Sequence, residues 1–341
     1  MNPSDQVHNP DAAAPQPLLS VRGLCVDFAS RRGTLRALDG LNFDVQAGEV
    51  LGVVGESGAG KSLTGAALIG LLDPPGRVSA GEIHWLGRRL DTLPEAEWRR
   101  VRGREIGAVF QDPLTSLNPL ITIGDQLVET IRTHLPLDPA AARARALSLL
   151  QATGIPAAEA RLGQYPHQLS GGMRQRVVIA LALAAGPKLV VADEPTTALD
   201  VSTQAQIMAL LRGLCREQGA AVLLITHDMG VIAETCDRVA VMYAGRIVEM
   251  GPVAEVIHRP SHPYTAGLMA SIPDTDQTRP RLAQIDGAMP RLDAIPAGCA
   301  FHPRCPRASE RCHQERPALV DGAHTRSACW HPISTAHEEP L

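Results

Sequence analysis

The chain has 341 residues, of which 45% are hydrophobic and 20% charged, so it can bury a large core and shows no sign of global disorder. Its formal net charge of −4 provides no basic surface to hold a nucleic-acid backbone, and nucleic-acid binding is not expected. No apolar run reaches the roughly 18 residues needed to span a bilayer, so we do not expect this chain to cross a membrane by itself.

The first 17 residues are rich in proline, aspartate and alanine, and they contain neither a basic region nor an apolar stretch of the kind found in export signals. We therefore expect a flexible leader over residues 1–17. Without an export signal, the seven cysteines are expected to be reduced thiols or metal ligands rather than disulfides. Cys25, Cys215 and Cys236 are scattered through the chain and suit small buried positions.

The next feature along the chain is a phosphate-binding loop. Residues 18–28 and 40–54 have the composition of strands, and the second segment runs directly into a G-x-x-x-x-G-K-S sequence at 55–62. Backbone N–H groups of such a loop surround phosphates, the lysine reaches the β- and γ-phosphates, and the serine hydroxyl ligates Mg²⁺. The residues expected to contact the nucleotide here are Gly55, Ser57, Gly58, Gly60, Lys61 and Ser62.

The remaining pattern predicts an α/β core interrupted by helices. After the helix that follows the loop to Leu72, residues 82–86 predict a strand, and the region of about 113–172 predicts an inserted helical subdomain. Strands and helices then alternate, which implies a mostly parallel sheet. This part is expected to contain helices over 123–135, 140–152 and 172–185 and from 202, strands at 189–192 and 222–226, and a hairpin at 239–243 and 246–249.

Several polar residues stand where strands end or helices begin. Asp193 and Glu194 follow an apolar strand, and this pair can hold Mg²⁺ and polarise an attacking water. His227 and Gln111 each follow another strand, although a lone histidine or glutamine is also common on a surface. Ser170 precedes a Gly-Gly turn that suits a γ-phosphate, and it can equally serve as a helix N-cap.

In this order the motifs resemble those of the ATP-binding cassette (ABC) family. They correspond to Walker A at 55–62, the Q-loop at Gln111, the signature at 169–173, Walker B at 189–194, the D-loop at 198–200 and the H-loop at His227. The resemblance covers residues 18–250. It implies a P-loop NTPase core of RecA-like type with an antiparallel β subdomain, in which two cassettes close face to face around ATP and Mg²⁺.

The resemblance also implies a role for each of these residues. Glu194 is the general base, Asp193 and Ser62 are Mg²⁺ ligands, and His227 contacts the γ-phosphate. Gln111 is a further Mg²⁺ ligand and joins the metal site to the membrane partner. The residues that act across the dimer interface are Ser170, Gly171, Gly172 and Asp200. Phe28 fits the aromatic residue that stacks on adenine, with a core phenylalanine as the alternative interpretation.

A narrower resemblance is to the ATPases of peptide and nickel permeases (Opp/Dpp type). Met173 replaces the usual glutamine of the signature, as is common in this branch, and residues 110–119 and 262–265 carry further marks of it. The branch implies an ATPase that powers import of dipeptides or oligopeptides. Import of nickel or another small solute is an alternative, and a different class of function is a soluble ABC ATPase acting on a ribosome or DNA.

The same resemblance implies partners and a location. An importer of this type needs a second ATPase subunit, for which we favour a paralogue over a second copy of this chain. It also needs two transmembrane permease subunits and an extracytoplasmic substrate-binding protein. The chain is then expected to lie peripherally on the cytoplasmic side of the inner membrane.

The last part of the chain, residues 251–341, is a small cysteine-rich extension. Cys299, Cys305, Cys312 and Cys329 are separated by five, six and sixteen residues. Four thiols suit zinc or an iron–sulfur cluster, and these gaps are wider than the close C-x₂₋₄-C pairs of most zinc sites. In peptide-permease ATPases this pattern is associated with a [4Fe-4S] cluster, so the resemblance favours that cluster over Zn²⁺ or free thiols. His302 and His313 lie nearby and are expected to be surface residues.

Overall fold

The computed structural model describes residues 16–31, 33–197, 200–272 and 284–333, and every structural statement below refers to these ranges. The predicted leader at 1–17 falls almost entirely outside them, as do two residues of the predicted D-loop. Within the described ranges no helix is both long enough and apolar enough to span a membrane.

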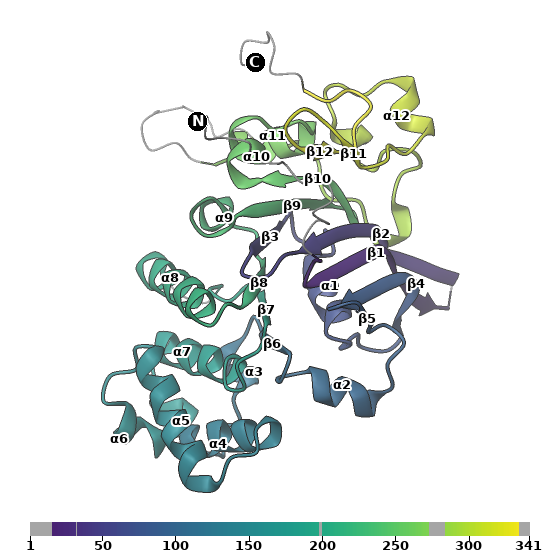
Figure 1. Ribbon diagram of the computed structural model, residues 1–341. Helices are drawn as coiled ribbons and strands as arrows, with labels where there is room; N and C mark the ends of the chain where they lie inside the picture. Colours follow the sequence, from purple (N-terminus) through teal and green to yellow (C-terminus); the bar gives the residue numbers. More distant parts are fainter. Residues whose placement is uncertain (1–15, 32, 198–199, 273–283, 334–341) are drawn as a thin grey trace, which may run out of the picture.

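An eight-stranded sheet forms the centre of the molecule, and its strand order is β11-β12-β10-β9-β3-β8-β7-β6 (Figure 1). The strands from β9 to β6 are parallel, as the alternation of strands and helices predicts. Every residue of β3 and β8 is buried, because helices or the second sheet cover both faces. The bounds of the parallel strands are Val50–Val54 (β3), Ile106–Val109 (β6), Leu189–Asp193 (β7), Ala221–Ile225 (β8) and Arg238–Tyr243 (β9).

A four-stranded antiparallel sheet packs beside this centre, with helix α1 (Lys61–Leu68) nearby (Figure 1). Its strands, in the order β2-β1-β4-β5, are Gly33–Val45, Leu19–Ser30, Gly76–Trp85 and Arg88–Arg89. The strand predicted at 82–86 is wrong in its bounds, since β4 begins at Gly76 and pairs with β1 from Leu19↔Trp85 to Phe28↔Gly76. A pairing of this kind between distant segments has no local sequence signal.

Helix α1 is also shorter than predicted, because it ends at Leu68 instead of Leu72. Gly70 has a φ of +64°, and a Cβ atom built on it would lie 2.5 Å from the Trp98 ring. The chain therefore leaves the helix through a left-handed glycine, against which a buried tryptophan packs.

The helices between β6 and β7 form a separate group at one end of the molecule, in the region where the sequence predicts an inserted helical subdomain (Figure 1). Thr122 and Asp138 cap the two longest, accepting hydrogen bonds from the N–H groups of Asp125 and Ala141. The bounds are Pro113–Ser116 (α3), Ile123–His134 (α4), Pro139–Ala152 (α5), Ala158–Leu162 (α6) and Gly171–Ala182 (α7). Helix α2 (Glu95–Val101) precedes β6, and the helices α8 (Val201–Glu217) and α9 (Met229–Thr235) follow β7 and β8.

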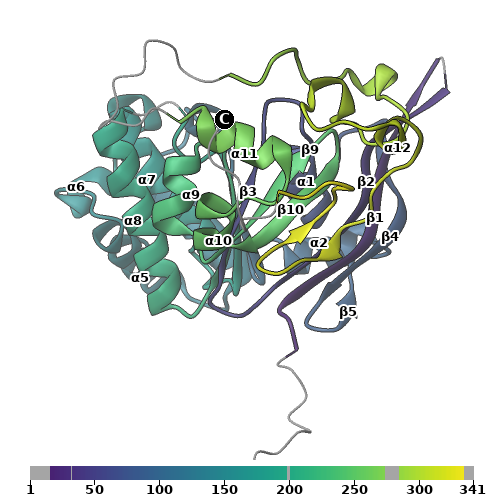
Figure 2. The same ribbon diagram turned by 90° about the horizontal axis from the view of Figure 1, so that it is seen from above.

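The C-terminal extension continues the central sheet. Strand β12 pairs with β10, so the edge of the nucleotide core is covered by residues more than seventy positions further along the chain. Figure 2 shows the extension lying along β10 and over the β1–β2 sheet. Its elements, with the strand that precedes it, are β10 (Arg246–Pro252), α10 (Val253–His258), α11 (Pro263–Ala270), η2 (Leu292–Ala294), η3 (His302–Arg304), α12 (Glu310–Gln314), β11 (Val320–Asp321) and β12 (Arg326–Ser327).

A buried carboxylate in β10 binds the C-terminal extension to the core. Glu249 in β10 is fully buried and accepts hydrogen bonds from Ser261 N–H at 2.7 Å, His262 N–H at 2.9 Å and Thr325 Oγ1 at 2.7 Å. Three donors from two separate segments of the extension therefore satisfy one charged group, as burial of a carboxylate requires.

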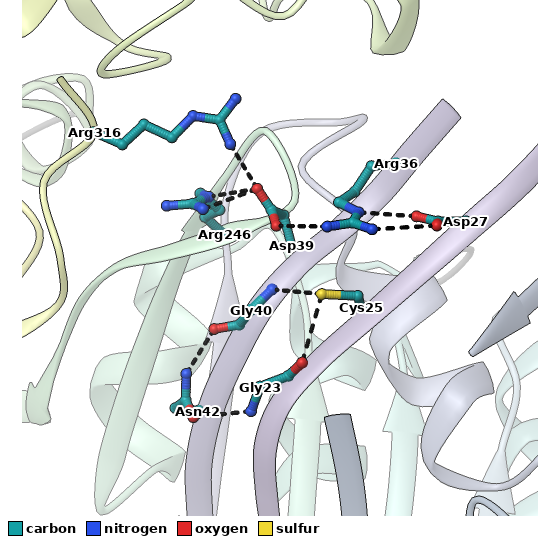
Figure 3. Close-up of polar contacts among 9 residues, drawn as sticks. All are labelled: Gly23, Cys25, Asp27, Arg36, Asp39, Gly40, Asn42, Arg246 and Arg316. Atoms are coloured by element: carbon teal, nitrogen blue, oxygen red, sulfur yellow. Dashed lines mark hydrogen bonds and ion pairs between the residues drawn. The ribbon is translucent and has the colours of Figure 1, made fainter. Parts of the chain in front are cut away.

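A second anchor lies over the antiparallel sheet (Figure 3). The guanidinium groups of Arg36, Arg246 and Arg316 converge on Asp39 of β2, with the closest contact at 2.6 Å from Arg316 Nη1 to Asp39 Oδ2. Only Arg316 comes from the extension, so this ion pair also joins the extension to the core.

Glu249→Gln is expected to lower the free energy of unfolding by about 1–3 kcal/mol, because the amide NH₂ of glutamine would face hydrogen-bond donors in a buried site. Urea unfolding of the variant measures this change. Glu129→Gln, on the exposed face of α4, is the matched control and should leave the unfolding curve unchanged. Equal stability of the two variants would contradict the role assigned to Glu249.

Candidate functional site

The predicted phosphate-binding loop lies between the buried strand β3 and the first turn of α1. Gly58 and Gly60 have φ values of +85° and +100°, a region that side chains disfavour. A Cβ atom on Gly60 would also lie 2.7 Å from Leu38, so this loop follows a path that requires glycine. The backbone amides and the N-terminal end of α1 suit a bound phosphate.

Lys61 is buried and crosses this loop. Its Nζ donates to the carbonyl oxygens of Gly55 at 2.9 Å and Glu56 at 3.1 Å. Burial lowers the pKa of Lys61 below its usual value, while the charges of Glu194 and Asp193 oppose that shift. The ammonium group is therefore held between the loop and the two acids.

Two of the predicted magnesium ligands, Ser62 and Asp193, are in direct contact. Ser62 Oγ donates to Asp193 Oδ1 at 3.0 Å, which joins the start of α1 to the end of β7. Burial raises the pKa of Asp193 above its usual value, with the hydrogen bond from Ser62 opposing the shift and the charge of Glu194 adding to it. A hydroxyl and a carboxylate oxygen at this separation form a suitable pair for Mg²⁺.

Glu194 is the residue on which the other predicted side chains converge. Its carboxylate accepts from Gln111 Nε2 at 3.0 Å and Thr197 Oγ1 at 2.8 Å, and His227 Nδ1 lies 3.3 Å from Oε1. Its backbone has a φ of +45°, which is unfavourable for a side chain and is typical of functional sites. The structure therefore brings Gln111, Glu194 and His227 together, as the sequence predicts.

The environment of Glu194 favours its ionised form. Burial raises its pKa, but the hydrogen bonds from Thr197 and His227 and the charges of His227 and Lys61 outweigh burial, so the pKa lies below its usual value. An ionised carboxylate can orient and deprotonate a water molecule at neutral pH.

A cleft of about 770 Å³ opens over these groups. Phe28 lines it from β1 and is partly buried, so its ring is available for stacking on a base. The complete lining is Phe28, Ala37, Ser57, Gly58, Gly60, Lys61, Ser62, Leu63, Gln111, Glu194, His227 and Leu292.

The residues predicted to act across an interface do not line this cleft. Ser170 caps α7 through Met173 N–H, and Asp200 caps α8 through Thr203 N–H, so the N-cap interpretation of Ser170 is confirmed. A Cβ atom on Gly172 would lie 3.1 Å from the Thr203 side chain, so the first turns of the two helices are neighbours. Gly171 begins α7 at the same place.

The four terminal cysteines line one small enclosed cavity, together with Phe301 and Trp330. Their sulfur atoms receive backbone hydrogen bonds: Cys299 from Phe301 and His302, Cys305 from Arg307, and Cys329 from His331. Cys312 Sγ lies 3.6 Å from Ser309 Oγ. Across the described ranges, no three His, Cys, Asp or Glu side chains are arranged as ligands of a metal ion. Cys25, Cys215 and Cys236 are buried elsewhere, as predicted.

The sequence did not reveal two further residues of the site. Thr197 lies three residues after Glu194 and donates a hydrogen bond to its carboxylate. A threonine at this short sequence separation could have indicated the contact. Leu292 lines the cleft from the extension, and no motif or periodic pattern marks it.

Two family models match the chain in consecutive regions. The model described as "ABC transporter" matches residues 38–197, and the model described as "Oligopeptide/dipeptide transporter, C-terminal region" matches residues 248–312.

Alignments with similar proteins cover nearly the whole chain. The dipeptide transport ATP-binding protein DppD of Escherichia coli strain K12 is 46% identical over 95% of this chain and 99% of its own length. The oligopeptide transport ATP-binding protein OppD of Salmonella typhimurium strain LT2 is 47% identical over 94% and 96%.

Two solved structures match a large part of this chain. The dimeric ATP-binding cassette MJ0796, in a post-hydrolysis state with ADP and Pi, matches with a TM-score of 0.62 and 29% identity over 69% of this chain and 98% of that one. CbiO1 of Clostridium perfringens, part of the ABC transporter complex cbiONQ, matches with a TM-score of 0.61 and 31% identity over 71% and 91%.

Proposed function

The chain belongs to the ABC transporter family of ATPases, and from that membership we propose that it powers the uptake of dipeptides or oligopeptides through transmembrane permease partners. The observation that supports this proposal most strongly is the presence of both regions in one chain, a cassette followed by the C-terminal region of oligopeptide and dipeptide transporters. Import of nickel or another small solute, and a soluble ATPase acting on a ribosome or DNA, are not favoured by the peptide-transport names of these relatives.

In this proposal, ATP binds in the cleft and contacts the phosphate-binding loop and residues at several strand ends. The loop amides and Lys61 hold the phosphates, and Phe28 stacks on the base. Ser62, Asp193 and Gln111 are the residues that would hold Mg²⁺, which neutralises phosphate charge when bound.

Glu194 acts as the general base in this proposal. Gln111, Thr197 and His227 fix the direction of its carboxylate, and the low pKa keeps the carboxylate ionised. We also propose that His227, which lines the cleft, contacts the γ-phosphate, as the resemblance implies.

A second cassette completes the site. Ser170, Gly171, Gly172 and Asp200 lie at neighbouring helix starts outside the cleft of their own chain, where they could contact ATP bound by a facing cassette. We favour a paralogue as that cassette. Two permease subunits, an extracytoplasmic substrate-binding protein and a position on the cytoplasmic side of the inner membrane complete the proposed importer.

The four-cysteine cavity is proposed to hold a [4Fe-4S] cluster. Four thiols line one cavity, as a four-cysteine ligand set requires. Burial raises the pKa of the Cys299, Cys305 and Cys329 thiols, and the backbone N–H groups directed at these sulfurs oppose that shift. The gaps of five, six and sixteen residues between these cysteines are wider than the C-x₂₋₄-C pairs of most zinc sites. The spacing and the resemblance to peptide-permease ATPases therefore favour a cluster, with Zn²⁺ as the alternative.

Glu194→Gln should lower ATP turnover by about 10²-fold or more, because the amide cannot accept a proton from water. Phosphate release by the assembled complex measures turnover, and calorimetric titration with ATP tests whether binding persists. Glu129→Gln is the control. Substantial remaining hydrolysis would overturn the assignment of the general base.

Affinity isolation of this chain from its own membranes in mild detergent tests the importer. Mass spectrometry should identify two permease chains and a second cassette. Recovery of ribosomal or DNA-associated proteins in their place would support the soluble alternative.

Anaerobically purified protein should be brown and should contain about four iron and four sulfide per chain. Cys312→Ser should remove most of both, whereas Cys25→Ser, in a separate buried site, should retain them. Stoichiometric zinc without iron would contradict the cluster.

A further inference from the structure

Glu56 of the phosphate-binding loop is held by two side chains of the C-terminal extension. Arg304 Nη1 donates to both carboxylate oxygens of Glu56 at 3.1 Å. The Tyr264 hydroxyl accepts the Glu56 backbone N–H at 2.9 Å. The residue directly after the first glycine of the loop is thus fixed through its side chain and its backbone.

Both partners are themselves rigidly held. The Arg304 side chain is only 7% exposed, and it also donates to the carbonyl oxygens of Asp286 at 2.8 Å and Ile285 at 3.3 Å. Its guanidinium lies within reach of the Tyr243 ring, 5.8 Å from the centroid. Tyr264 is fully buried. The Glu56 side chain is 28% exposed, so solvent screens this charge pair only in part.

Lys61 provides a third attachment point on the same residue. It donates to the Glu56 carbonyl oxygen at 3.1 Å. The N–H, the carboxylate and the carbonyl of Glu56 therefore each have a fixed partner, and two of the three come from the extension. A loop that must present its amides to phosphates binds more tightly when its conformation is set in advance.

Apolar residues of the extension also reach the loop. Leu292 lines the nucleotide cleft together with Phe28. A Cβ atom on Gly58 would lie 3.8 Å from Met289, so this methionine packs over the middle of the loop. The extension thus contacts the site at three separate places.

We propose that the C-terminal extension preorganises the phosphate-binding loop of its own chain, with Arg304 and Tyr264 as positioning residues that set the affinity for ATP. The inference depends only on nucleotide binding at this loop, and it is independent of the cargo and of what the cysteine cavity holds.

The test uses the purified full chain in a Glu194→Gln background, which prevents hydrolysis, and measures the affinity for Mg·ATP by calorimetry. Arg304→Gln should weaken binding by about fivefold or more. Arg304→Lys, which retains the charge, should restore part of the loss. Tyr264→Phe removes only the hydroxyl and should weaken binding in the same direction without threatening the fold.

A double-mutant cycle separates positioning from general stability. Because Arg304 acts through the Glu56 carboxylate, Glu56→Gln and Arg304→Gln together should weaken binding by much less than the product of the single effects. In the hydrolysing complex, the Arg304 variant should raise KM for ATP more than it lowers kcat, since loop preorganisation affects binding first.

Arg316→Gln is the matched control, because Arg316 also joins the extension to the core, through Asp39 (Figure 3), and within the described residues it pairs with Asp39 and not with a residue of the phosphate-binding loop. It should bind ATP like the parent chain. The proposal is overturned if Arg316→Gln weakens binding as much as Arg304→Gln, or if both Arg304→Gln and Tyr264→Phe bind like the parent. Failure of the parent to bind any ATP would overturn the nucleotide site itself.

Discussion

The parallel register of four neighbouring strands determines where the nucleotide site lies. In the order β3, β8, β7 and β6, Val53 pairs with Ile225, Ile225 pairs with Asp193, and Ala192 pairs with Val109. The carboxyl ends of these strands consequently reach one edge of the sheet. The phosphate loop, Glu194, His227 and Gln111 follow those ends and line one cleft, and Asp193 ends β7 beside it, so segments far apart in the chain meet there.

Charged side chains in and around that cleft change one another's pKa. Lys61 lies between the loop carbonyls and the two acids, and their charges oppose the effect of burial on its pKa. The acids in turn differ, because burial and a neighbouring charge raise the pKa of Asp193 whereas hydrogen bonds lower that of Glu194. Two adjacent carboxylates thereby have different environments, with the ionised form favoured at Glu194 and disfavoured at Asp193 in this structure.

The C-terminal extension is part of the same structural unit as the core. Strand β12 pairs with β10, the buried Glu249 receives hydrogen bonds from two segments, and the Arg316–Asp39 ion pair adds a third connection. Arg304 immediately precedes Cys305, so the contact with Glu56 and the cysteine cavity are consecutive in sequence. A region that sequence composition distinguishes from the core is structurally continuous with it.

The sequence alone determined the features that are local. Glycine spacing identified the phosphate loop, apolar runs ending in polar residues identified Asp193, Glu194 and His227, and periodicity identified the helices α4 and α5. The sequence did not predict that β4 begins at Gly76, because this start depends on pairing with β1. It also did not predict the position of Leu292 in the cleft. Glu56 and Arg304 are 248 residues apart, and only the packing of the extension on the sheet brings them together. Motifs and periodic patterns depend on residues that are near one another in the chain, so the sequence reveals them. Contacts between distant segments depend on strand register and packing, and only the tertiary structure decided them.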